Sequence, residues 1–173
     1  GQGSRRVSTR QAEACATAFK MIPRYTRPEM GRIWSDQNKF QTWLEVELAA
    51  SQALAEMGVV PREAAEQLAR HAAFDAARIH EIERDVKHDV IAFTTAVAEK
   101  MATAGAAEAS RWFHYGLTSN DVVDTAQALQ VAQASKLIAA GLEDLRQVLR
   151  ERAHEFRHAV CIGRTHGVHA EPT

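Results

Sequence analysis

The chain has 173 residues, of which 46% are hydrophobic and 25% are charged. This is a globular composition, and the length is enough for one core, or for one small domain and part of a second. The 21 basic and 22 acidic residues give a formal net charge of -1, which excludes the basic surface of a nucleic-acid-binding or membrane-surface protein. We therefore expect a small-molecule partner or copies of the same chain, and neither nucleic acid nor membrane.

The cysteines suit a reducing compartment, and the hydropathy pattern argues against a membrane-spanning segment. Cys15 and Cys161 stand far apart and form no CxxC motif, so neither a disulfide framework nor a cysteine metal site is predicted. No stretch approaches the roughly 20 apolar residues that span a bilayer. We predict a cytoplasmic protein. Residues 1–20 precede the organised sequence, and we interpret them as a leader or as an extension carried over from cloning.

Helical periodicity starts after Pro28. Ser35 or Asp36 is predicted to cap a helix that ends near Gly58, and Pro61 is predicted to open a short second helix. The first of these helices carries, at helical spacing, Phe40, Trp43, Leu44, Glu47 and Leu48.

A third helix is predicted to start at Asp75, because Phe74 and Ile79 flank this residue at the spacing of a hydrophobic staple. We expect Ile79, Ile82 and Val86 to point inward. The apolar stripe breaks at residues 87–89. It then resumes with Val90, Phe93 and Val97 and fades at Gly105.

The longest helical pattern follows residues 118–121, which have the two hydroxyls and the acid of a helix N-terminus. Its apolar positions are Ile138, Leu142, Leu145, Leu149 and Phe156. Their spacing of three or four residues predicts a long helix that needs a large apolar partner surface.

No segment predicts a β-hairpin or a βαβ unit. The predicted fold class is therefore all-α. An N-terminal helical domain is predicted at residues 21–117, followed by the start of a long-helix bundle at residues 118–173. We expect the chain to end inside that bundle.

Three polar clusters break the helical pattern, and each suits a site. Residues 163–167 place the His166 imidazole between two glycines and beside a cation, which allows close backbone approach to a ligand. Residues 118–121 offer hydroxyls and a helix N-terminus to a carboxylate or phosphate. Residues 87–89 can pair an anion-binding cation with an imidazole. The plain alternatives are a surface turn, a helix cap and a solvated helix face.

A fourth pattern indicates a different chemistry. His154, Glu155 and His158 match the HExxH motif of zinc peptidases. However, Arg152 and Arg157 crowd the two histidines. We therefore predict no metal site and interpret the segment as a solvated helix end.

Taken together, these clusters resemble the N-terminal part of the adenylosuccinate lyases, a family of the fumarase/aspartase superfamily. The resemblance runs from Met21 to Thr173. Its specific stretches are residues 21–30, 87–93, 114–126 and 163–172. It implies a β-elimination that releases fumarate from two purine intermediates, adenylosuccinate and the succinocarboxamide ribotide of de novo purine synthesis, without a metal or organic cofactor.

The resemblance also implies the roles of individual residues. The equivalent of His166 is a catalytic proton donor or acceptor, which we assign to protonating the departing nitrogen, and His88 would support it and bind substrate. The implied substrate-binding residues are Arg24 and Tyr25 on the phosphate and ribose side, Lys87, His88 and Asp89 near the reacting centre, Thr118 and Ser119 on a succinyl carboxylate, and His114 and Thr165.

The residue types fit this chemistry on physical grounds. Removal of a proton next to a carboxylate builds negative charge that helix-terminal amides, hydroxyls and cations stabilise, and a histidine can protonate the leaving amine. Members of the family also carry a later serine-bearing loop, the expected source of the base, and a bundle that forms a tetramer. The chain ends before both, so we expect it to be inactive alone.

Three alternatives remain open at this point. One is a superfamily sibling such as an argininosuccinate lyase or a cycloisomerase. Another is a zinc-dependent hydrolase that uses His154 and His158. The third is a non-catalytic helical module for oligomerisation.

Overall fold

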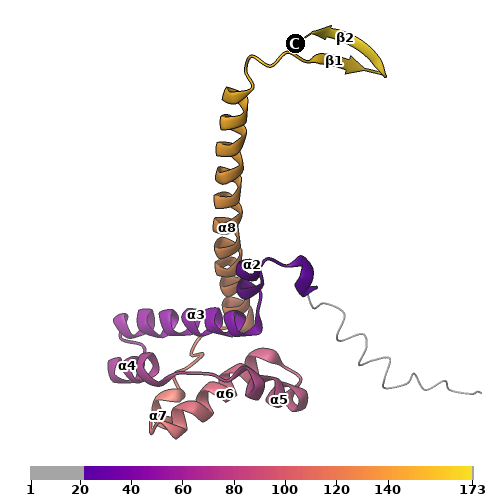
Figure 1. Cartoon of the computed structure of the whole chain (residues 1–173). Helices are drawn as coiled ribbons and strands as arrows, with labels where there is room; N and C mark the ends of the chain where they lie inside the picture. The colour runs from indigo at the N-terminus through magenta and orange to yellow at the C-terminus, as the bar shows by residue number, and fades with distance from the viewer. Residues whose placement is uncertain (1–21, 173) are drawn as a thin grey trace, which may run out of the picture. The chain divides into compact units, whose positions relative to one another are not determined.

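The computed structural model describes residues 22–172 and divides into two compact units, one that ends at Ala134 and one that begins at Ser135. The interpretation of residues 1–20 as a leader or extension lies outside the described residues. The elements of the first unit are a 3-10 helix η1 (Pro23–Tyr25), α2 (Pro28–Ile33), α3 (Asp36–Glu56), α4 (Arg62–His71), α5 (Ala76–Val86), α6 (Asp89–Thr103), α7 (Ala107–Ser110) and the first part of α8 (Ser119–Glu155) (Figure 1).

The predicted helix starts are confirmed by their caps. The Ser35 hydroxyl accepts a hydrogen bond from the backbone N–H of Asn38, as the N-cap of α3. Asp75 accepts hydrogen bonds from the N–H groups of Ala77 and Arg78, as the N-cap of α5. Each cap satisfies N–H groups that have no partner within the helix, which explains why short polar residues mark these starts.

An aromatic cluster fills the core of the first unit, between α3, α5, α6 and the segment after α7. Phe93 of α6 is fully buried; its ring stacks on Phe40 with the centroids 6.0 Å apart and meets Trp43 edge-on at 5.5 Å. Phe74 and Phe113 also lie against Phe93. Offset and edge-on ring pairs stabilise a fold by more than the burial of their area alone, so these contacts help to fix α6 against α3.

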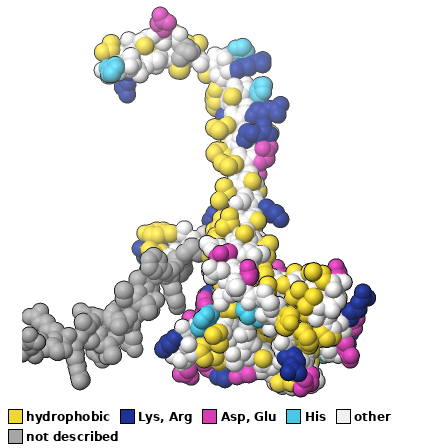
Figure 2. All heavy atoms as spheres, turned by 180° about the vertical axis from the view of Figure 1, so that it is seen from behind, with side chains coloured by type: hydrophobic (Ala, Val, Ile, Leu, Met, Phe, Trp, Pro, Cys, Tyr) yellow, Lys and Arg dark blue, Asp and Glu magenta, His cyan; other side chains and the backbone are white. Residues whose placement is uncertain are grey.

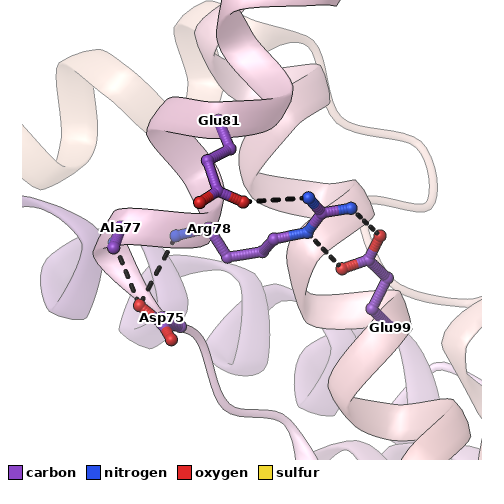
Figure 3. A network of polar contacts seen from close by, with 5 residues as sticks. All are labelled: Asp75, Ala77, Arg78, Glu81 and Glu99. Carbon is purple, nitrogen blue, oxygen red and sulfur yellow. Dashed lines mark hydrogen bonds and ion pairs between the residues drawn. The ribbon is translucent and has the colours of Figure 1, made fainter.

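The expectation that Val86 points inward is wrong, although Ile79 and Ile82 are buried as predicted. Val86 is 43% exposed because it is the last residue of α5, and the chain turns left-handed immediately after it. α5 and α6 are instead joined at their surface by Arg78, which donates two hydrogen bonds to Glu99 at 2.9 Å and one to Glu81 (Figure 3). These bonds raise the pKa of Arg78 and lower that of Glu99.

The first part of α8 packs into the first unit at every fourth residue. The buried positions are Val122, Ala126, Gln130 and Ala134. The Gln130 amide donates to the Ile33 carbonyl at 2.7 Å, and Asn38 donates to the Gln133 side chain at 2.9 Å. These bonds tie the start of the long helix to the end of α2 and to α3.

The second unit contains the rest of α8, which ends at Glu155, and a two-stranded antiparallel sheet of β1 (Ile162–Thr165) and β2 (Val168–Pro172). The expectation that no hairpin forms is wrong here. His166 and Gly167 have φ angles of 47° and 77°, and two successive residues with positive φ make the tight turn that matches the twist of paired strands. The fold class is still all-α, with this small hairpin as an addition. Among residues 22–172, no helix is both long and apolar enough to cross a membrane.

Candidate active site

The junction between α5 and α6 presents the first polar cluster. Lys87 ends α5 in the left-handed conformation, with φ 55°, and its N–H still bonds to the Glu83 carbonyl. His88 is extended and is the N-cap of α6. Two residues therefore end one helix and start the next, which leaves Lys87 and His88 exposed at a fixed turn.

One ring nitrogen of His88 is already occupied by a hydrogen bond to the backbone. Its Nδ1 atom accepts a hydrogen bond of 3.3 Å from the Ile91 N–H, so in the neutral ring the hydrogen sits on Nε2. Nε2 is then a donor for a ligand. Asp89 Oδ1 lies 3.7 Å from the same Nδ1 atom, so a carboxylate oxygen stands beside the imidazole.

A second pair joins α3 to the segment before α8. His114 Nδ1 lies 2.6 Å from Glu47 Oε1. Glu47 is fully buried, and its other oxygen, Oε2, has no hydrogen-bond partner among the described residues. Burial raises the pKa of the Glu47 carboxyl above its ordinary value, and the hydrogen bond to His114 opposes this rise. The carboxyl group is thus costly to ionise, and His114 is its one partner among residues 22–172.

The start of α8 is a capping box. Asp121 Oδ2 accepts hydrogen bonds from the Thr118 N–H at 2.7 Å and from the Thr118 hydroxyl at 2.8 Å, and Thr118 Oγ1 accepts from the Asp121 N–H at 3.3 Å. The bonds from Thr118 lower the pKa of Asp121, and nearby His114 lowers it further. The first turn of α8 therefore lies within electrostatic reach of His114. Ser119 is partly buried there.

The remaining predicted residues lie at the two ends of the described chain. Arg24 donates to the Tyr25 hydroxyl at 3.2 Å, and its guanidinium lies 4.8 Å from the centre of the Tyr25 ring. Both side chains are exposed. In the second unit, Thr165 ends β1 and His166 occupies the first position of the turn, with Gly167 behind it.

Phe93 of α6, the helix that His88 caps, packs on Phe113 with ring centroids 5.9 Å apart, and His114 follows Phe113. The sequence prediction missed Glu47 as the partner of His114. A signal was available, since Glu47 is an acid among the apolar positions of its helix.

The HExxH pattern does not have the geometry of a zinc motif. Such a motif needs both histidines one turn apart on one helix. α8 ends at Glu155, so His154 lies in its last turn and His158 lies beyond it, where its Nε2 accepts a hydrogen bond from Arg157. Within residues 22–172, no three His, Cys, Asp or Glu side chains gather as a metal site would require.

The fold and the polar clusters define a member of a lyase family. Residues 23–173 match the profile of the family described as Lyase, and the chain belongs to it.

Curated relatives point to one group within this family. The chain is 51% identical over 153 residues to the adenylosuccinate lyase of Bacillus subtilis, covering 88% of this chain and 34% of the relative. It is 51% identical over 152 residues to that of a Synechocystis species, with the same coverage. The resemblance to adenylosuccinate lyases is thus confirmed, and the chain spans about a third of the length of these relatives.

Solved structures of the superfamily share the fold. The chain is similar to a 3-carboxy-cis,cis-muconate lactonizing enzyme from Pseudomonas putida, with a TM-score of 0.75 and 32% identity over 86% of this chain and 34% of that one. A fumarate lyase from Mesorhizobium sp. BNC1 has a TM-score of 0.74 and 30% identity over 83% of this chain and 33% of that one. These structures support the prediction of a helical fold.

Proposed function

We propose that this chain forms part of an adenylosuccinate lyase. The reaction removes fumarate from adenylosuccinate to leave AMP, and from the succinocarboxamide ribotide of de novo purine synthesis to leave the carboxamide. The observation that carries this proposal is the 51% identity to two curated adenylosuccinate lyases. The family match from residue 23 to residue 173 takes in all the polar clusters described above.

The chemistry needs an acid, a base and a place for developing charge. A base removes the proton from the carbon next to a succinyl carboxylate, the C–N bond breaks, and the electron pair of that bond leaves with the nitrogen. Charge accumulates on the carboxylate as an aci-carboxylate, so donors placed there lower the barrier. We assign these donors to Ser119 and to the N-terminal amides of α8, which form a positive helix end. Thr118 would join them by exchanging its hydroxyl bond to Asp121 for one to the substrate.

The acid is assigned to His166. An amine leaves poorly unless it is protonated, and an imidazolium can supply the proton. The tight turn of His166 and Gly167 presents this imidazole at the tip of the hairpin, with Thr165 beside it to bind substrate. The base lies outside the assigned residues, and we expect a serine on a later loop of the complete enzyme.

The other residues are proposed to bind the nucleotide. Arg24 and Tyr25 would hold the phosphate and ribose side, and Lys87 with Asp89 would hold the substrate near the reacting centre. His88 offers Nε2–H as a donor because its Nδ1 is committed to the helix cap. His114 is placed with them as a further binding residue.

We also propose that the complete enzyme is a cytoplasmic homotetramer of purine biosynthesis, with residues 21–117 and 118–173 as domain segments. The second part of α8 supports the assembly, because it carries a row of exposed apolar side chains (Figure 2). A row of this size on one helix face indicates a protein partner. Copies of the same chain are the partner proposed here.

The test is fumarate release from adenylosuccinate by the protein expressed from its complete reading frame, with the 173-residue chain assayed beside it. We expect turnover in the complete protein that collapses in His166→Ala. The same preparation is offered argininosuccinate, the substrate of a sibling enzyme. Release of fumarate from argininosuccinate alone, or from neither compound, would overturn the proposal.

A further inference from the structure

The buried carboxylate of Glu47 is not explained by stability. The side chain is 0% exposed, and Oε2 has no hydrogen-bond partner among the described residues. Burying a carboxylate costs free energy that a single partner does not fully return, and a neutral side chain of similar shape is often at least as stable. A group that is costly in the core and is bonded to a site residue is a candidate for function.

Its partner is held in an unusual conformation. His114 has φ 63°, a left-handed backbone that is strained for a residue with a Cβ atom. The preceding residue, Phe113, is buried against Phe93, so the backbone has little freedom to relax. The His114 side chain is 25% exposed, which leaves one edge of the ring accessible while its Nδ1 atom faces the core.

The proton count on the pair fixes which nitrogen is accessible. When the pair carries one proton, His114 Nδ1–H donates to the ionised Glu47 carboxylate. When it carries two protons, there are two arrangements. In one, both ring nitrogens are protonated and Glu47 is ionised; in the other, the Glu47 carboxylic acid donates to Nδ1 and the ring hydrogen is on Nε2. A hydrogen lies between Oε1 and Nδ1 in each case, so Nε2 is the one ring nitrogen available to a ligand. In both two-proton states, Nε2 carries a hydrogen that can be donated to an anion.

We infer that Glu47 is a positioning residue of the active site, which holds His114 by Nδ1 and, when the pair carries two protons, presents Nε2–H to an anionic group of the substrate. This inference rests on the proposed function, because it gives His114 a substrate with carboxylate and phosphate groups. A carboxylate that orients a histidine from behind is an established device in enzymes, and its loss lowers activity while the fold is kept.

The first arm of the test observes the bonded hydrogen in the 173-residue chain by proton NMR, and does not depend on catalysis. We expect a downfield signal from the hydrogen between His114 Nδ1 and Glu47 Oε1 that is absent in His114→Gln, which assigns it, and lost or broadened by exchange in Glu47→Gln. The control is Glu45→Gln, the same change at an exposed position two residues away on α3, which should keep the signal. Absence of the signal from the unaltered chain would overturn the inference.

The second arm measures kinetics in the complete protein. Glu47→Gln is expected to lower kcat/KM for adenylosuccinate by about tenfold or more, with the melting temperature unchanged or raised. Glu47→Asp keeps the carboxylate, so its kcat/KM should fall by less than that of Glu47→Gln. A Glu47→Gln enzyme with full kcat/KM beside an impaired His114→Gln enzyme would overturn the inference, as would a loss fully explained by unfolding. If the unaltered enzyme releases no fumarate, the proposed function and the substrate contact fall together, and the NMR arm still decides whether Glu47 holds the ring.

Discussion

His88 Nδ1 accepts a hydrogen bond from the backbone N–H of Ile91, so one nitrogen of this exposed imidazole caps α6 and the other takes no part in the cap. The two roles can be separated. Asparagine is among the best N-cap residues, whereas alanine is among the poorest. The same position therefore tests structure and chemistry with two substitutions.

We predict that His88→Asn keeps the stability of the chain and lowers fumarate release in the complete enzyme, whereas His88→Ala lowers both. The expected loss of stability in the alanine variant is about 1 kcal/mol, the usual effect of removing a cap. Urea unfolding of the 173-residue chain and the fumarate assay measure the two effects. Equal stabilities of the two variants would show that the cap does not contribute.

Glu47 predicts a pH dependence of stability. Burial raises its pKa above the ordinary value of 4.5, so the folded state prefers the protonated carboxyl. The stability that this preference contributes is present below about pH 4.5 and is lost as the pH rises through the raised pKa.

Relative to Glu47→Gln, the unaltered chain should therefore become less stable as the pH increases, by about 1.4 kcal/mol for each unit by which the pKa is raised. Unfolding curves of both proteins at several pH values above 4.5 measure this difference. Glu45→Gln is the matched control and should show no such trend. A difference that grows in the opposite direction would mean that the hydrogen bond from His114 outweighs burial.

Replacement of Lys87 by glycine is predicted to make the chain more stable and to weaken substrate binding. Its φ of 55° suits glycine better than a residue with a Cβ atom, and the left-handed conformation costs about 1 kcal/mol. Lys87→Gly should therefore stabilise the chain by up to that amount, while raising the KM of the complete enzyme. Lys100→Gly, inside α6, is the control and should destabilise by about 1 kcal/mol. Destabilisation by both substitutions would contradict the prediction.

His166 can be replaced without breaking its turn. Its φ is 47° and that of Gly167 is 77°, and Asn-Gly is the preferred pair for such a turn. His166→Asn is expected to keep the hairpin, seen by NMR as the pairing of Thr165 with Val168, and to reduce kcat by about a hundredfold or more. Retained activity in this variant would remove His166 from proton transfer.

The exposed apolar row on the second part of α8 predicts self-association. Its members are Ile138, Leu142, Leu145 and Leu149, each more than half exposed. Leu142→Glu combined with Leu145→Glu should shift the chain toward the monomer in sedimentation velocity. Ala140→Glu combined with Gln147→Glu, on the opposite side of the helix, should not. Equal behaviour of the two double variants would indicate that this row is not the contact.

Much of the helical fold could be predicted, because its signals are local. Ser35 and Asp75 mark helix starts through bonds to N–H groups two or three residues away, and the core positions of α3 and α6 follow helical spacing. Val86 was misplaced because periodicity alone does not show where a helix ends. The hairpin was missed because His-Gly was not treated as a turn pair, although its φ angles are those of Asn-Gly.

The candidate site is less visible in the sequence than the fold, and its residue roles stay predictions. The clusters at residues 87–89, 118–121 and 163–167 are visible because each is contiguous in the sequence. The bond between Glu47 and His114 joins residues 67 positions apart, and no local pattern indicates that pairing. The one signal in the sequence is an acidic residue among the apolar positions of a helix, which indicates a buried carboxyl group that needs a partner.

The two-residue joint between α5 and α6 also sets how this region tolerates changes of length. Lys87 closes one helix and His88 opens the next, so an extra residue between them would displace both caps and redirect both side chains. In the five-residue connection from Met57 to Pro61, the end of α3 and the start of α4 are separated by further residues. Insertions in surface loops of this kind lower stability little. A scan of single-residue insertions should therefore find the joint among the least tolerant positions of the first unit, and related sequences should keep its length fixed.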